Sequence, residues 1–131
     1  MDSLGVEYGA SHSEILVNEN EDIRIVEIGS RMGGDCIGSD LVELSTGFDF
    51  LAAVISVATG HEPDMNVHEH ADYAMIRFIF DDNDLAMLQQ AECDASVKVE
   101  RSSVDSDMDH EIVDSGSRYG FYILTSDSID N

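Results

Sequence analysis

The chain has 131 residues, of which 43% are hydrophobic, and 28 acidic against 6 basic side chains give it a net charge of −22. The hydrophobic content is sufficient for a packed core, which argues against a disordered chain. The acidity argues against a nucleic-acid partner, because few cations are present to displace phosphate counterions, and it also disfavours anionic membranes.

The length fits one domain, or one domain with a small appendage. No apolar run is long enough to span a membrane, and the first residues lack the basic and apolar regions of a signal peptide, so we expect a cytoplasmic protein. Cys36 and Cys93 follow no metal-ligand spacing, and two free thiols are expected.

Two strand-like segments flank an acidic turn near the N-terminus. Ser13–Val17 and Ile23–Ile28 are rich in aliphatic and β-branched residues, and the polar stretch between them is a turn signal. If Glu19–Asp22 forms the hairpin loop, Asn18 pairs with Ile23 and Leu16 with Ile25.

The same register places Glu14 directly opposite Glu27, on one face of the hairpin. Like charges in directly opposed positions are destabilising, so the pair calls for an explanation. A shared divalent cation would supply one, because Mg²⁺ takes one or two protein carboxylates and completes its shell with water and phosphate oxygens. The alternative is a different loop length, which would offset the two side chains and leave one of them facing water.

A longer pattern follows the second strand. The run EIGSRMGGD, at 27–35, resembles the signature that closes the active site of ATP-grasp enzymes, in which a strand carries Glu-x-Asn-x-Arg and glycines follow. The resemblance continues through IGSDLV (37–42) and STGFDF (45–50), and it is closest to the carbamoyl-phosphate-synthase-like branch of carboxylate–amine ligases. In that family an upstream strand supplies a first metal-binding carboxylate, a place that the run HSE at 12–14 matches.

The resemblance implies roles for five residues. Glu14 and Glu27 would bind Mg²⁺, and Arg31 would stabilise an acyl-phosphate or its transition state as the catalytic residue. The backbone of Gly33 and Gly34 would contribute to cofactor binding by helping to hold an oxyanion.

Two neighbouring positions bear on this site. The family often has asparagine as a third metal ligand where this chain has Gly29, so coordination would depend more on nucleotide phosphates. His12, at the start of the first strand, either touches substrate or is a strand-end histidine in a polar setting.

The implied parent is an ATP- and Mg²⁺-dependent carboxylate–amine ligase with an acyl-phosphate mechanism. In the family, lysines and a flexible glycine-rich loop precede this region and clamp the nucleotide, whereas the only lysine here is Lys98, far downstream. The chain therefore resembles a C-terminal fragment that is not active alone. Its expected partner is a second copy, as a homodimer, or a separate chain that supplies the nucleotide-binding subdomains. The alternative is a non-catalytic relic or partner subunit that acts through self- or hetero-association.

Helices are expected after the glycine-rich loop. Ser39 or Asp40 can cap a first helix that ends near Gly47. Phe48–Thr59 predicts a second helix that is apolar on nearly all sides and should therefore be buried. Two histidines with flanking acids at 68–72 could bind a transition metal, but two or three ligands alone make a weak site, so a solvated strand entrance is the preferred interpretation.

The remaining chain predicts strands at Tyr73–Phe80, Ser96–Arg101 and Tyr119–Thr125, with a helix at Leu85–Ala91. The fold class is therefore α+β, a mostly antiparallel sheet with two to three helices, corresponding to the C-terminal part of an ATP-grasp fold. Residues 1–60 would form the metal-binding segment of that fold, and residues 61–131 a small α/β subdomain.

Overall fold

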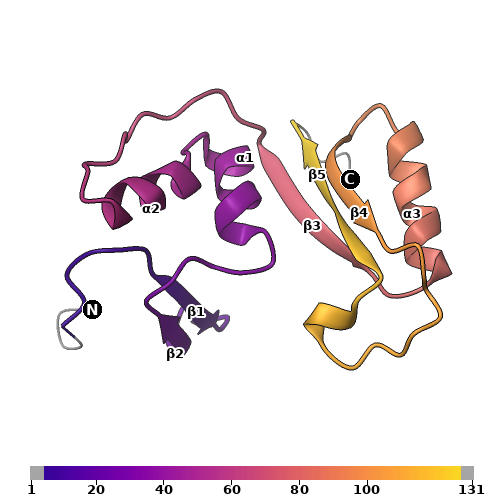
Figure 1. The fold of residues 1–131 in the computed structure, drawn as a ribbon, viewed down its shortest axis with the longest axis horizontal. Helices are drawn as coiled ribbons and strands as arrows, with labels where there is room; N and C mark the ends of the chain where they lie inside the picture. The colour runs from indigo at the N-terminus through magenta and orange to yellow at the C-terminus, as the bar shows by residue number, and fades with distance from the viewer. Residues whose placement is uncertain (1–4, 128–131) are drawn as a thin grey trace. The chain divides into compact units, whose positions relative to one another are not determined.

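The computed structural model describes residues 5–127, which contain three α-helices and two antiparallel sheets, so the α+β prediction is confirmed. The chain divides into two compact units (Figure 1). Unit 1 comprises residues 1–43 and 48–68, and unit 2 comprises residues 44–47 and 69–131. Among the described residues, no helix has the length and apolar character needed to cross a membrane.

Unit 1 begins with a hairpin of β1 (His12–Val17) and β2 (Ile23–Gly29). Asn18 organises its loop, because the Asn18 side-chain oxygen accepts hydrogen bonds from the backbone N–H of both Asn20 and Asp22 at 2.9 Å. This is the usual reason that asparagine favours turns. A π-helical turn, η2 (Ile37–Leu41), then leads into α1 (Val42–Thr46).

Helix α2 (Phe50–Ala58) completes unit 1 and lies inside the predicted range. Asp49 caps its N-terminus by accepting a hydrogen bond from the Ala52 N–H at 2.8 Å. The prediction that this helix is buried is wrong, since Ala53 is its only buried residue and Ile55 is 55% exposed. Uniform apolarity indicates that a helix can be buried, but it does not supply the second layer that would bury it.

Unit 2 is a three-stranded sheet with one helix packed on it. Its strands are β3 (Tyr73–Ile79), β4 (Lys98–Val104) and β5 (Gly120–Ser126), in the spatial order β3-β5-β4, with β5 antiparallel to both neighbours. Helix α3 (Asp82–Cys93) contributes Leu88 to the core. The other buried members of that core are Ile79, Tyr122 and Leu124.

The predicted strands and helix of unit 2 are all present, with shifted ends. Helix α3 starts earlier than predicted because the Asp81 side chain accepts a hydrogen bond from the Asp84 N–H at 3.0 Å and so caps the first turn. Strand β4 starts later, at Lys98, because Ser96 is held in a turn by two hydrogen bonds to the Asp94 carboxylate.

Candidate metal and phosphate site

Glu14 and Glu27 lie directly opposite each other in the hairpin, as predicted. The pairs between them and the turn differ from the predicted ones. The predicted pairs Asn18–Ile23 and Leu16–Ile25 are wrong, since Ile23 pairs with Val17 and Leu16 with Arg24. A bulge between Ile25 and Glu27 then shifts the register by one residue and restores the predicted alignment of the two carboxylates.

The bulge gives the hairpin two chemically different faces. Successive side chains of a strand alternate between faces, and cross-strand partners share a face. The face with the two carboxylates, called the polar face, carries six residues: His12, Glu14 and Leu16 from β1, and Arg24, Glu27 and Gly29 from β2. The opposite face, called the apolar face, carries Ser13, Ile15, Val17, Ile23, Ile25 and Ile28.

Arg31 lies beside Glu27, with 3.9 Å between the Arg31 Nη2 and the Glu27 Oε1. Both side chains are about 60% exposed, and an exposed pair at this distance contributes little to stability. Arg31 also donates from Nη1 to the Met32 carbonyl oxygen at 2.9 Å, which fixes one side of the guanidinium. A Cβ on Gly29 would stand 3.5 Å from Arg31 Cγ and 3.9 Å from Glu27 Oε1, so the glycine leaves open the space between them.

The glycine-rich loop packs against His12, at the start of β1. Gly33 is buried, and a Cβ there would approach the His12 Cδ2 and the Ile37 Cγ2 to 3.2 Å. Gly34 differs, because it is exposed and a Cβ on it would meet nothing within 4 Å. Of the two glycines expected to hold an oxyanion, Gly34 is therefore the accessible one, and Gly33 serves the packing of the loop against β1.

His12, for which the sequence left a substrate contact and a strand-end position open, starts β1 on the polar face. Its Nδ1 atom is buried and has no hydrogen-bond partner among the described residues. Buried polar atoms are usually paired with protein or ordered water, so this atom is an exception among the described residues. His12 shares the polar face with Glu14 and Glu27, and its Cδ2 lies close to Gly33.

The residues present fit Mg²⁺ better than a transition metal. No group of three or more His, Cys, Asp or Glu side chains suited to a metal ion occurs within residues 5–127, and this includes the segment at 68–72. Structural zinc sites need four such ligands. Mg²⁺ usually takes one or two carboxylates and obtains the rest of its oxygens from water and phosphate, which matches the pair of Glu14 and Glu27.

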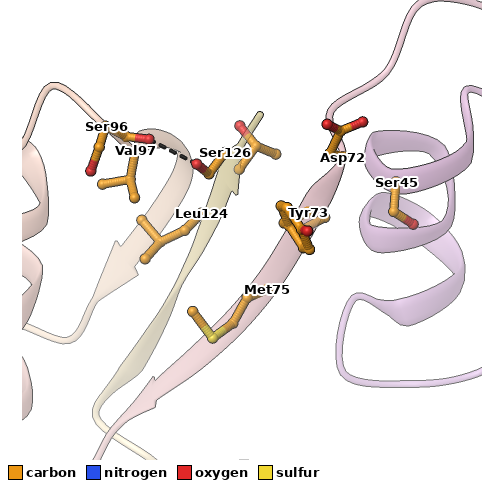
Figure 2. Close-up of a pocket in the computed structure, with 10 residues that line it drawn as sticks. Ser45, Asp72, Tyr73, Met75, Ser96, Val97, Leu124 and Ser126 are labelled. Atoms are coloured by element: carbon orange, nitrogen blue, oxygen red, sulfur yellow. Dashed lines mark hydrogen bonds between the residues drawn. The ribbon is translucent and has the colours of Figure 1, made fainter. Parts of the chain in front are cut away.

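Unit 2 contains a pocket of about 580 Å³ that the sequence did not reveal (Figure 2). Tyr73 and Met75 of β3 line it with Leu124 of β5, and Ser126 Oγ donates to the Ser96 carbonyl oxygen at 2.9 Å on its border. Its described lining includes one carboxylate, Asp72, and no basic side chain. This pocket is therefore unsuited to nucleotide phosphates.

Comparison of the chain with protein-family models, with curated proteins and with solved structures finds no match.

Proposed function

We propose that the chain is the C-terminal portion of an ATP- and Mg²⁺-dependent carboxylate–amine ligase, in which the hairpin and the glycine-rich loop form the metal and phosphate side of the active site. The observation that carries this proposal is the direct opposition of Glu14 and Glu27 on one face, with Arg31 beside Glu27. The sequence resemblance to ATP-grasp enzymes selects the same three residues.

The opposed carboxylates supply the physical argument for a cation. Directly opposed like charges destabilise a sheet, and only the loosely placed Arg31 offsets them here. When bound between these carboxylates, Mg²⁺ would neutralise the charge that develops on a transferring phosphoryl group. Glu14 and Glu27 would hold the ion through their carboxylate oxygens.

Arg31 is suited to the phosphoryl group itself. Its guanidinium can present two parallel N–H donors to a phosphate, an arrangement that a lysine cannot provide. The long distance to Glu27 and the exposure of both side chains leave Nη2 accessible to such a ligand. The accessible N–H of Gly34 would lie in the same loop, where backbone donors cost no reorganisation when they stabilise an oxyanion.

The proposed partner is a separate chain that supplies the nucleotide clamp. Lys98, the only lysine, lies on β4 in unit 2 and forms an ion pair with Glu100 at 2.8 Å. The partner would therefore carry the lysines that hold ATP, and its positive charge would complement the strong acidity of this chain.

A second candidate function is a non-catalytic module that acts through association alone. The observation in its favour is the apolar face of the hairpin, whose five aliphatic side chains are 44–65% exposed. Contiguous exposed apolar surface of this kind marks interaction sites. The five residues are Ile15, Val17, Ile23, Ile25 and Ile28.

A thermal-unfolding titration with Mg²⁺, with and without ATP, tests the ligase proposal on the wild type and on Glu27→Gln. A ligand at 100 times its Kd stabilises by about 2.7 kcal/mol, so the wild type should show a clear rise in Tm. Glu27→Gln removes the repulsion with Glu14, so we expect it to be more stable than the wild type without metal and unresponsive to metal. The matched control is Glu111→Gln, at an exposed loop position of unit 2, which should respond like the wild type. Equal responses of Glu27→Gln and the wild type would exclude the carboxylate pair as the metal site.

A further inference from the structure

The outer edge of β2 carries backbone N–H and C=O groups that have no strand partner in the described structure. The described sheet of unit 1 contains only β1 and β2, so β2 has a partner on one side alone. An isolated two-stranded hairpin is marginally stable in water, and an unpaired edge is a template for a further strand. Its apolar residues Ile23, Ile25 and Ile28 are 65%, 64% and 44% exposed, so no described element covers them.

The sequence of β2, IRIVEIG, is complementary to itself in charge. It contains one cation, Arg24, and one anion, Glu27. An antiparallel copy aligned about the point between Ile25 and Val26 would place each Arg24 opposite the Glu27 of the other copy. The same alignment places each Ile23 opposite the Ile28 of the other copy. Because the arrangement is symmetric, the Arg24–Glu27 ion pair and the Ile23–Ile28 aliphatic pair each occur twice. Opposite charges and aliphatic residues in directly opposed positions stabilise sheets.

The bulge is what makes this alignment geometrically allowed. In a regular strand, residues 24 and 27 point to opposite faces, so they could not face each other in an antiparallel self-pairing. Here Arg24 pairs with Leu16 and Glu27 with Glu14, two residues of β1 that share a face. The extra residue, Val26, therefore brings Arg24 and Glu27 onto the polar face together.

The backbone hydrogen bonds agree with the alignment. The Asn18 N–H donates to the Asp22 carbonyl oxygen at 3.2 Å, so this pair points its polar groups inward across the hairpin. Hydrogen-bonded and non-hydrogen-bonded pairs alternate along an antiparallel ladder. The N–H and C=O of Ile23, the residue after Asp22, therefore point away from β1, and those of Ile28 do the same after the bulge. These two residues would be a hydrogen-bonded pair across the new ladder.

We propose that a second copy of this chain pairs antiparallel with β2, which joins two hairpins into a four-stranded sheet through reciprocal Arg24–Glu27 contacts. Arg24 has no ion pair or side-chain hydrogen bond within residues 5–127, and Glu27 has only the 3.9 Å contact with Arg31. In the dimer each Glu27 would stand between Glu14 of its own hairpin and Arg24 of the other copy. The pairing leaves the apolar face of each hairpin available to the separate chain of the ligase proposal, and it does not rest on that proposal.

The charge of β2 explains why this strand, and not another part of the chain, can pair with a second copy. Arg24 and Glu27 make β2 electrically neutral, whereas the whole chain has a net charge of −22. At about 0.5 M salt the screening length falls to roughly 4 Å, so repulsion between the distant acids is removed while contact pairs persist. The dimer should therefore be stronger at this salt concentration than at low salt.

Sedimentation velocity over a concentration series at high salt tests the proposal with charge-exchanged variants. We expect reversible dimerisation of the wild type, and a dissociation constant raised about ten-fold by Arg24→Glu or by Glu27→Arg, because each change replaces two attractive pairs by two repulsive ones. The double variant carrying both changes restores the complementary pairing and should dimerise like the wild type. Glu111→Arg is the net-charge control for Glu27→Arg, since it changes the net charge by the same amount at an exposed position of unit 2.

A strictly monomeric wild type, or a double variant as weak as the single ones, would overturn the proposal. Backbone hydrogen exchange of the wild type gives a measurement without substitutions, because protection of the Ile23 and Ile28 N–H groups should rise with protein concentration. The double variant also separates this inference from the ligase proposal. It lacks the Glu27 carboxylate, so it should form the dimer and fail to respond to Mg²⁺ with ATP.

Discussion

Gly38 shows how a single residue holds the glycine-rich loop in place. It is buried, and a Cβ on it would overlap with the Met32 Cγ and stand 2.7 Å from the Met32 Sδ. We predict that Gly38→Ala lowers the free energy of unfolding by about 1–3 kcal/mol, the usual cost of overpacking. Urea denaturation measures this, with Gly34→Ala as the control because a Cβ there meets nothing within 4 Å. A destabilisation of Gly34→Ala equal to that of Gly38→Ala would contradict the packing argument.

The residues of the candidate site were partly predictable from the sequence. The two strands that carry Glu14 and Glu27 were predictable, because strand composition and turn signals are local properties that a short stretch of sequence contains. The unsatisfied Nδ1 of His12 was not predictable, because its burial depends on contacts between β1 and segments that follow it in the chain, such as the one at Gly33. Burial of one atom is a tertiary property with no local signature in the sequence.

At the scale of elements, ends and registers were harder to predict than the elements themselves. Helix α2 was predictable from the Asp49 cap and the long apolar run that follows it. The bulge at Val26 was not, because no residue type marks it and the wrong loop length happened to yield the right carboxylate pair. The pocket of unit 2 was also hidden, since its lining comes from β3, β5 and the turn before β4.

The pairing of β4 with β5 includes a polar contact whose strength depends on pH. Glu100 accepts a hydrogen bond from Thr125 Oγ1 at 2.7 Å, and Lys98 Nζ lies 2.8 Å from its other oxygen. Burial works to raise the pKa of Glu100, but the hydrogen bonds from Lys98 and Thr125, together with the charge of Lys98, outweigh it and lower the pKa. A lowered pKa in the folded state means that the ionised form stabilises the fold above the unfolded pKa and that this contribution is lost as the pH falls.

We therefore predict that Glu100→Gln is less stable than the wild type at pH 7, by about 1 kcal/mol. The difference should shrink as the pH drops through and below the ordinary pKa of glutamate, because the wild-type carboxyl then becomes neutral as well. Urea midpoints of both proteins between neutral and acid pH measure this, with Glu92→Gln on the exposed side of α3 as the control. A stability difference that stays constant with pH would show that Glu100→Gln acts through altered packing and not through the loss of the carboxylate charge.

For the whole molecule, the dominant physical fact is a net charge of −22 on 131 residues. Self-repulsion of this size opposes the compact state, and two of the few cations, Arg101 and Arg118, lie over the rings of Phe121 and Phe78 at 5.3 and 3.7 Å. With 28 acidic against 6 basic side chains, the chain has too few cations to place one beside each carboxylate. Stability must then depend on the ions of the solvent.

We predict that raising the salt concentration from about 0.1 M to about 1 M, which shortens the screening length from roughly 10 Å to 3 Å, stabilises the chain by about 1 kcal/mol or more. Thermal unfolding would show this as a rise in Tm of roughly 3–5 °C for a chain of this length. The control is the same series near the isoelectric point of about 4.1, where the net charge vanishes and salt should have little effect. An equal rise at both pH values would mean that salt acts by strengthening apolar burial, as excluded salts do, and the charge of the surface would then not limit the stability of this fold.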